Sequence, residues 1–353
     1  MKFDFVIGNP PYQNETLGDN KTYAPPVYNL FMDESFKIGE KVELIHPARF
    51  LFNAGSTPKA WNKKILEDQH FKILYYEADS SKVFANTDIK GGLVVSYRDS
   101  INNFGAIGTF TVFNELNEIL KKVVTDNFKS FNSLIYAPES YRFTQNLHDE
   151  HPDLKDRKIV VNGKEQPLLS KGHLFDVSTN IFEKLNFIFI DQASDDAEYC
   201  CILGRYNNKR MYKWIKKDYI RNHENLDRYK VFLPKSNGSG ALGETLSTPV
   251  LGMPGQGHTQ SFISIGAFTS QYEAESVLKY IKTKFARVML GTLKVTQDNK
   301  KASWSNVPMQ DFTDQSDIDW NKSISEIDKQ LYKKYGLSND EIDFIESHVK
   351  EMN

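Results

Sequence analysis

Apolar runs and helical spacing alternate over the first 125 residues. Apolar runs predict strands at 3–7, 42–46 and 71–76, the first of them short and buried. Helical spacing at Leu30, Phe31, Ser35 and Ile38 predicts a helix over 28–38 that shares this apolar face and stops at Gly39. Further helices are expected from residue 61 to 66 and from 114 to 124. Because strands alternate with helices, we expect α/β layering.

The pattern changes after about residue 125. Strands are expected at 187–190, 199–203 and 229–233, among scattered prolines and glycines. From Asp311 to Glu346 the chain carries ten acids against four lysines. Ser323 with Glu326, and Ser338 with Glu341, have capping-box spacing, which predicts two closing helices. We expect this acidic segment to pack on the body of the protein and to turn away from any nucleic acid.

The first strand leads directly into Asn9-Pro10-Pro11-Tyr12. Two prolines fix their own φ angles, so the Asn9 amide, the Pro10 carbonyl and the Tyr12 ring are held in a nearly preset arrangement. A planar base with an exocyclic amine fits this set. Its two N–H donors match the Asn9 oxygen and the Pro10 carbonyl, and the Tyr12 ring can stack on an extruded base. Pro-rich tetrads are also common simple turns.

A strand followed by Asn-Pro-Pro-Tyr resembles the catalytic motif of DNA adenine-N6 methyltransferases, especially those of type II (type IIG-like) restriction–modification enzymes. The resemblance implies methyl transfer from S-adenosylmethionine to N6 of a flipped adenine, with Asn9, Pro10, Pro11 and Tyr12 as the catalytic residues. Phe84, in the segment that runs on through Asp88-Ile-Lys-Gly-Gly92, matches the family's second base-gripping ring. A core role for Phe84 is the alternative. Lys90 is expected at the same base site.

The resemblance also implies a cofactor loop, which the family places before the motif. Here only Met1 and Lys2 precede Phe3. Gly238-Ser-Gly-Ala-Leu-Gly243 fits a glycine-rich dinucleotide pattern, but it lacks the helix and acidic partner that such a loop needs. We interpret it as a flexible recognition loop. We therefore expect an incomplete S-adenosylmethionine site, completed by a separate polypeptide that carries the cofactor-binding half.

Two stretches of the middle region are locally basic. Arg205 to Arg221 holds seven basic residues against one acid, interleaved with aromatic residues, and a similar imbalance recurs from Lys279 to Lys301. Such patches neutralise phosphates, although a single patch is usually a solvated face. The expected contacts to double-stranded DNA are Arg205, Lys209, Arg210, Lys213, Lys216, Lys217, Arg221, Lys235, Lys284 and Arg287.

Composition limits the other possibilities. The net charge is −2, so any DNA binding comes from local patches. The adjacent pair Cys200 and Cys201 has no zinc or disulfide spacing, and we expect no metal. With no apolar run long enough to span a bilayer, a cytoplasmic location is expected. Pro25-Pro26-Val27-Tyr28 could serve as a polyproline ligand if Tyr28 is exposed.

The sequence thus predicts an α/β protein with three parts. Residues 1–125 form a partial Rossmann-like methyltransferase sheet with the catalytic motif, 126–310 an α+β target-recognition domain, and 311–353 an acidic helical hairpin. The alternative to an enzyme is a non-catalytic DNA-recognition protein or an inactive, truncated remnant of a restriction–modification enzyme.

Overall fold

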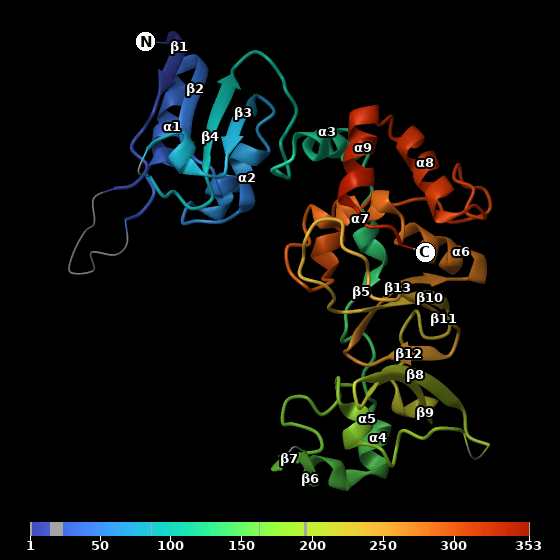
Figure 1. Ribbon diagram of the computed structural model, residues 1–353. Coiled ribbons are helices and arrows are strands. Elements are labelled where there is room, and N and C mark those ends of the chain that lie inside the picture. The colour runs from blue at the N-terminus through green and yellow to red at the C-terminus, as the bar shows by residue number, and fades with distance from the viewer. Residues whose placement is uncertain (1, 15–23, 86, 162, 194–195, 353) are drawn as a thin grey trace. The chain divides into compact units, whose positions relative to one another are not determined.

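The structure is a computed structural model that describes residues 2–14, 24–85, 87–161, 163–193 and 196–352. The chain divides into two compact units, Met1–Lys121 and Lys122–Asn353. In Figure 1 the first unit runs from blue to blue-green and the second from green to red. Each unit mixes helices with β-sheet, so the fold is α/β with several sheets.

The first unit is built on a four-stranded sheet in the order β1-β2-β4-β3. Its strands are β1 (Phe3–Gly8), β2 (Gly39–Pro47), β3 (Phe71–Glu77) and β4 (Leu93–Asp99). β1 pairs parallel to β2, and β4 runs antiparallel to both β2 and β3. β1, β2 and β3 therefore all point the same way, and their carboxyl ends reach one edge of the sheet.

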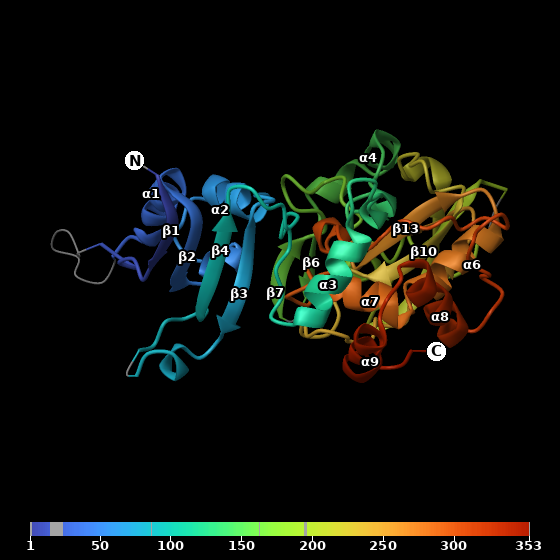
Figure 2. The same ribbon diagram turned by 90° about the horizontal axis from the view of Figure 1, so that it is seen from above.

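Helices α1 (Tyr28–Ile38) and α2 (Lys59–Leu66) cover one face of this sheet, as Figure 2 shows. Their buried residues pack on Val42, Leu44, Phe71 and Val94 in one core cluster. The predicted limits of α1 are confirmed, but its predicted apolar face is wrong. Leu30, Phe31 and Ile38 are exposed, whereas Tyr28 and Met32 are buried against the sheet. Burial of Tyr28 also removes the polyproline-ligand alternative.

β1 lies at the edge of the sheet and is exposed, which corrects the prediction of a buried strand. Phe3, Phe5 and Ile7 are 49%, 63% and 77% exposed and share one face of the strand by its two-residue period. Val6, on the other face, packs against the core below α1 and α2. The sequence pattern detects an apolar strand, but burial depends on packing neighbours, and among the described residues they reach only the Val6 face.

The described residues of the second unit form three sheets, ordered β11-β10-β13-β5, β12-β8-β9 and β6-β7. Their strands are β5 (Ile135–Tyr136), β6 (Lys158–Val161), β7 (Lys164–Pro167), β8 (Tyr199–Tyr206), β9 (Lys209–Lys216), β10 (Tyr229–Pro234), β11 (Val250–Gly252), β12 (Gln256–His258) and β13 (Phe262–Phe268). The predicted strand at 187–190 is absent: Ile188 and Phe189 are buried in a turn, and only Ile190 bridges to Trp214.

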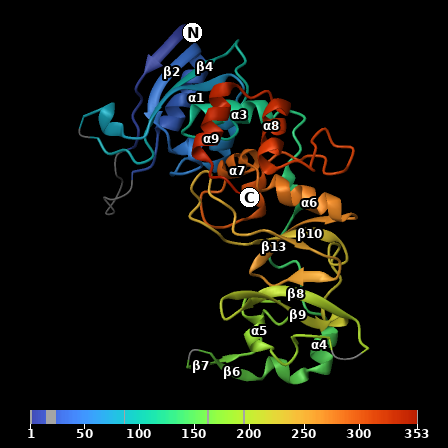
Figure 3. The ribbon, with the colours of Figure 1, turned by 45° about the vertical axis from the view of Figure 1, so that its right-hand side comes forward.

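The longer helices of the second unit gather at one end of it, and the β8–β9 hairpin lies toward the other (Figure 3). The helices are α4 (Gln145–Glu150), α5 (Ile181–Lys184), α6 (Gln271–Tyr280), α7 (Lys284–Gly291), α8 (Ile324–Lys334) and α9 (Asn339–His348); α3 (Asn114–Val123) spans the boundary between the units. Among the described residues, no helix has the length and apolar character to cross a membrane.

The acidic C-terminal helices pack on the body of the second unit, as expected. Both predicted capping boxes are present, with Ser323 and Glu326 at α8 and Ser338 and Glu341 at α9. The buried Asp328 carboxylate accepts the backbone N–H groups of Lys284 and Phe285 at the start of α7, at 3.0 and 2.9 Å. A carboxylate at a helix N-terminus is stabilising, so the acids of this segment hold α7 in place.

The buried imidazole of His46 in β2 makes the stability of the first unit depend on pH. Its Nε2 lies 2.7 Å from Ser96 Oγ, and burial lowers its pKa to about 4. The unfolded chain therefore binds more protons than the folded chain between pH 6.5 and 4. Neutral His46 therefore contributes fully to the free energy of unfolding above pH 6.5. About 3 kcal/mol of that free energy is lost as the pH falls toward 4.

We expect His46→Gln to flatten this acid slope, because glutamine does not titrate. Urea unfolding followed by hydrogen exchange in β2 and β4 would measure it between pH 4 and 7. His70→Gln is the matched control, because the His70 ring lies at the surface. Equal acid slopes for wild type and His46→Gln would contradict the prediction.

Candidate functional site

The strand registers of the first sheet bring three chain segments to the same end of the sheet, where β1, β2 and β3 terminate. Gly8 pairs with Leu44 near the carboxyl end of β1, and Leu93 at the start of β4 pairs with both Pro47 and Glu77. The segments that follow β1, β2 and β3 therefore meet at the carboxyl edge of the strands. Ligand sites of open α/β sheets occur at this kind of edge.

The turn after β1, residues 9–12, is called here the motif turn. After Tyr12 the chain doubles back on itself: Gln13 bridges Pro26, Asn14 N donates to Pro25 O at 2.9 Å, and Val27 N donates to Tyr12 O at 3.2 Å. These contacts tie the motif turn to the start of α1. For the polar residues 13–23 the sequence predicts a loop, and most of them lie outside the described residues.

Polar groups of the motif turn are left available. Asn9 is exposed, and the Pro10 carbonyl accepts no hydrogen bond from the described residues. The Tyr12 hydroxyl oxygen is buried without a hydrogen-bond partner among them. Burial raises the pKa of Tyr12 above its usual value, and the neighbouring Asn9 amide offsets part of that rise. The turn therefore presents acceptors and a neutral phenol ring at the sheet edge.

The segment after β3, called here the 80–92 loop, is organised by the buried Ser80. Its hydroxyl donates to Thr87 O at 3.1 Å and accepts from Ile89 N at 2.8 Å, and its carbonyl accepts from Phe84 N at 2.9 Å. Sequence analysis missed Ser80, since a lone serine in a loop carries no spacing signal. These bonds fix the backbone on both sides of the Phe84 side chain.

Two glycines close the 80–92 loop onto its neighbours. Gly91 and Gly92 have φ angles of +90° and +79°, which only glycine adopts without strain. A Cβ on Gly92 would lie 2.3 Å from the carbonyl oxygen of Glu77. Gly92 O also accepts from Ala48 N at 3.0 Å, which joins the loop to the turn after β2. The Gly-Gly pair is therefore needed for a close backbone approach.

The expected base-binding residues lie on this loop. Phe84 is half-buried, and Lys90 is exposed without an ion pair among the described residues. No ring contact within the described chain joins Phe84 to Tyr12. The motif turn follows β1 and the 80–92 loop follows β3, the two outer strands of the sheet. Both segments therefore lie at the carboxyl end of the strands, but the rings of Tyr12 and Phe84 do not touch.

The first basic stretch lies largely on the β8–β9 hairpin, where folding adds acids that the local sequence count omits. Lys213 pairs with Asp191 at 2.8 Å, and Lys216 with Glu150 at 3.5 Å. Lys217 pairs with Glu198 and Asp227, while Arg210 donates to the carbonyls of Ser247 and Thr248. Of the expected DNA contacts, four are exposed and form no ion pair with the described residues: Arg205, Lys209, Arg221 and Lys235.

The second basic stretch is structural, which corrects the prediction for Arg287. Arg287 is 2% exposed, and its guanidinium donates to the carbonyls of Lys282, Gly243, Glu244 and Lys350. It has no surface to offer a phosphate.

Lys284 of the same stretch pairs with Glu346 at 2.5 Å. Lys294 is buried, and its amine donates to the carbonyls of Asn237 and Thr296. The imbalance of charge from 279 to 301 is therefore compensated within the fold, by carbonyls and by the acidic C-terminal segment.

The glycine-rich segment 238–243 has no free N–H groups for a cofactor phosphate at Ser239 and Gly240, and its close packing does not match the flexible loop that we expected. Its backbone N–H groups at Ser239 and Gly240 donate to the Glu244 carboxylate at 2.8 and 3.1 Å. The ligand that such a loop would cradle is replaced by this acid of the chain itself. A Cβ on Gly240 would lie 2.4 Å from Thr296 N, so the segment is tightly packed.

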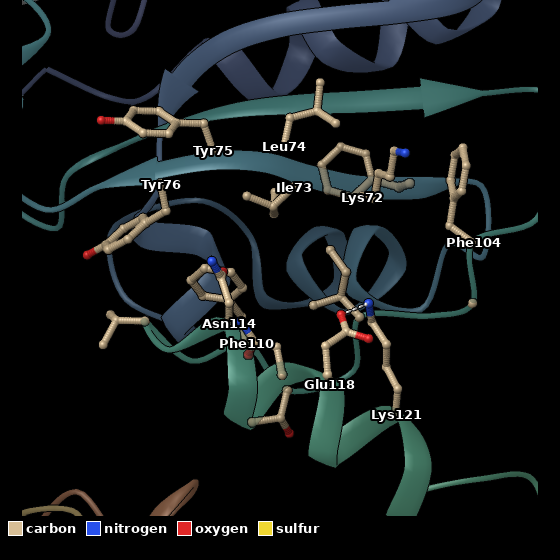
Figure 4. A pocket seen from close by; sticks show the side chains of 16 residues that line it. Lys72, Ile73, Leu74, Tyr75, Tyr76, Phe104, Phe110, Asn114, Glu118 and Lys121 are labelled. Carbon is tan, nitrogen blue, oxygen red and sulfur yellow. Dashed lines mark hydrogen bonds and ion pairs between the residues drawn. The ribbon is translucent and has the colours of Figure 1, made fainter. Parts of the chain in front are cut away.

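A separate groove of about 470 Å³ lies in the first unit, along β3 and the first turns of α3 (Figure 4). Tyr75, Tyr76 and Phe110 line it, and the Glu118–Lys121 ion pair of 2.6 Å lies at one end. Its lining includes neither the motif turn nor Phe84. We therefore do not assign it to the candidate site.

A family match falls on the motif-bearing part of the chain. Residues 1–84 match the model of the Eco57I restriction-modification methylase family. An uncharacterized adenine-specific methylase of Mycoplasma pneumoniae is 30% identical over 95 residues, which is 26% of this chain and 22% of the relative. The resemblance to restriction–modification methylases is therefore confirmed.

Two solved structures are similar over most of the chain. The type IIG restriction endonuclease BpuSI has a TM-score of 0.32 and 12% identity, over 92% of this chain and 48% of its own. The type IIL restriction-modification enzyme MmeI, in complex with DNA, has a TM-score of 0.29 and 9% identity, over 98% of this chain and 56% of its own. This chain spans about half the length of those two proteins.

The contact made by Gly92 can be tested with a matched pair of substitutions. Gly92 and Gly105 have nearly equal φ angles, +79° and +78°, but a Cβ on Gly105 meets nothing within 4 Å. We expect Gly105→Ala to cost about 1–2 kcal/mol through backbone strain alone. Gly92→Ala should cost at least about 2 kcal/mol more, because of the clash with Glu77. Chemical unfolding measures both, and equal costs would contradict the close approach.

Proposed function

We propose that this chain is the base-binding and DNA-recognition part of a site-specific adenine-N6 DNA methyltransferase. The observation that carries the proposal is the motif turn, which lies at the same sheet edge as the 80–92 loop, within the residues that match the restriction-modification methylase family. In the proposed reaction the methyl group of S-adenosylmethionine is transferred to the exocyclic amine of a flipped adenine.

The role of the motif turn follows from the chemistry of that amine. Its lone pair is delocalised into the purine ring, which makes the nitrogen a weak nucleophile. The Asn9 side-chain oxygen and the Pro10 carbonyl would each accept one N–H of the amine. Two acceptors placed out of the ring plane would localise the lone pair on the nitrogen and direct it at the methyl donor. The available Pro10 carbonyl and exposed Asn9 support this role.

Tyr12 and Phe84 would hold the extruded ring. Stacking between aromatic side chains compensates part of the energy of flipping a base out of the duplex. Burial raises the pKa of the Tyr12 phenol, which further favours its neutral form. In the described residues the two rings make no contact with each other or with other aromatic rings.

The described residues do not fit S-adenosylmethionine. The only glycine-rich segment of suitable spacing, 238–243, donates its N–H groups to Glu244. We therefore propose that a cofactor-binding half outside the described residues, tested below as a separate polypeptide, completes the site. The free edge of β1 and its exposed residues Phe3, Phe5 and Ile7 support this proposal, because parallel strands are normally covered on both faces.

The second unit would contact double-stranded DNA through the β8–β9 hairpin. Arg205, Lys209 and Arg221 are exposed cations in this region, and Tyr212 and Trp214 are 40% and 36% exposed on one face of β9. The ion pairs of Lys213, Lys216 and Lys217 involve partly exposed groups and are worth little energy, so phosphates could replace the acids.

We expect Asn9→Ala to lower methyl transfer by about 10²–10³-fold, a loss typical of removing one group that stabilises the transition state. The assay measures labelled methyl transfer from S-adenosylmethionine to mixed-sequence DNA. It uses the chain alone and the chain with the product of the gene immediately upstream. Asn103→Ala is the control, since Asn103 is an exposed amide beyond the opposite end of β4.

The same assay separates the alternatives. Activity of the chain alone would mean that it holds a complete cofactor site, and activity only with the neighbour would establish a divided enzyme. Full activity of Asn9→Ala would reject the catalytic role of the motif turn. If no combination transfers methyl groups while DNA binding is retained, the chain is a recognition protein.

The proposed interface on β1 makes a separate prediction. Ile7→Lys should abolish association with the cofactor-binding polypeptide and the activity that depends on it, because a charge would have to be buried at the interface. Ile101→Lys is the matched control, since Ile101 is 69% exposed and Ile7 is 77% exposed. Co-purification and methyl transfer measure the effect. Association that survives Ile7→Lys would place the interface elsewhere.

A further inference from the structure

A cation that sequence analysis did not select lies at the candidate site. Arg49 begins the 3₁₀ turn (Arg49–Phe52) directly after β2, at the sheet edge shared by the motif turn and the 80–92 loop. It is exposed, and no acid or hydrogen-bond acceptor among the described residues binds its guanidinium. Arginines of the same unit can behave differently: Arg98 pairs with Asp68 at 2.8 Å.

The aliphatic stem of Arg49 is enclosed by two glycines. A Cβ on Gly91 would lie 2.6 Å from Arg49 Cγ, and one on Gly55 would lie 3.2 Å from Arg49 Cβ. Both glycines have left-handed φ angles, +90° and +89°, so the backbone itself closes around the stem. An unpaired surface arginine normally loses side-chain entropy when it binds a ligand. Here the surrounding backbone has already restricted the stem.

The backbone that carries Arg49 is also held. Arg49 O accepts from Ala54 N at 3.0 Å, and Ala48 N donates to Gly92 O at 3.0 Å. The positive charge of Arg49 acts on the buried Tyr28 hydroxyl, whose pKa burial raises to about 12. That hydroxyl stays protonated and cannot neutralise the guanidinium. The site thus keeps a positioned, uncompensated positive charge.

A guanidinium on a fixed stem matches an anion with paired oxygens. Its planar fork binds phosphate or carboxylate in a bidentate manner. Neighbouring strands lie about 4.8 Å apart, so the turn after β2 is next to the motif turn after β1. A nucleotide whose base reaches the motif turn would carry its own backbone phosphates within reach of this edge.

We propose that Arg49 binds a backbone phosphate of the DNA strand that carries the target adenine. This proposal rests on the proposed function. In this role Arg49 positions the strand beside the base-binding residues and takes no part in the chemistry of the amine. A contact of this kind fixes register and carries no sequence information.

The test measures binding of the full chain to a mixed-sequence duplex in which one adenine stands opposite an abasic site, which lowers the energy of flipping that base. The dissociation constant is followed against salt concentration for wild type, Arg49→Gln, Arg49→Lys and Lys72→Gln. Lys72 lies on β3 near the opposite end of the strands, paired with Tyr97. Lys72→Gln is the matched control, because it also removes one positive charge but does so away from the candidate site.

We expect Arg49→Gln to weaken binding and to reduce the slope of log K against log salt by about 0.9, the value for one phosphate contact. Arg49→Lys should keep the slope and lose only part of the affinity, because it retains the charge without the fork. Lys72→Gln should leave the slope unchanged. In the methyl-transfer assay Arg49→Gln should raise KM for DNA and leave kcat within about twofold.

An unchanged slope for Arg49→Gln, with wild-type binding intact, would overturn the phosphate contact and leave the proposed function standing. A raised KM for S-adenosylmethionine in place of DNA would assign Arg49 to a carboxylate of the cofactor and would equally overturn it. Failure of the wild-type chain to bind the duplex would reject both proposals. Hydrogen exchange of β2 and β4 confirms that each variant is folded.

Discussion

Strand β2 pairs with β1 on one side and with β4 on the other, and the candidate site depends on the register of both pairings. The pair Gly8–Leu44 sets where the motif turn leaves the sheet, and the pair Pro47–Leu93 sets where the 80–92 loop returns to it. A slip of one residue in either ladder would move every side chain of a strand to the opposite face. The bond from Ala48 N to Gly92 O and the missing Cβ of Gly92 then close the edge.

Helices cover one face of the same sheet, whereas apolar side chains of β1 are exposed on the other. α1, α2 and the cluster around Trp61 and Phe71 bury one side, whereas Phe5 and Ile7 are exposed on the other. A free edge strand with exposed apolar side chains is a template for strand pairing and aggregation unless something covers it. The exposed face and the poor fit of the described residues to the cofactor both support the proposal that a further, cofactor-binding part completes the sheet.

Charge in the second unit shows how folding changes a local sequence count. The residues from 279 to 301 are rich in lysine and arginine, yet Arg287 and Lys294 are buried and donate to backbone carbonyls. The acidic C-terminal helices supply further partners, such as Glu346 for Lys284. By contrast, the β8–β9 hairpin keeps exposed cations and aromatic side chains together. The exposed cations available for the proposed DNA contact are therefore fewer than the sequence suggests.

Much of the local structure follows from the sequence by itself. Apolar runs located β1, β2, β3 and β10, serine capping boxes located α8 and α9, and two prolines after a strand located the motif turn. These features depend on residues near one another in the chain, and local sterics and hydrogen bonds decide them. Tertiary structure decided what each element faces: which side of α1 is buried, that β1 is an exposed edge, and that Arg287 is a core residue. It also brought Arg49 between Gly55 and Gly91. Burial and charge compensation depend on partners distant in the sequence, and no local pattern encodes them.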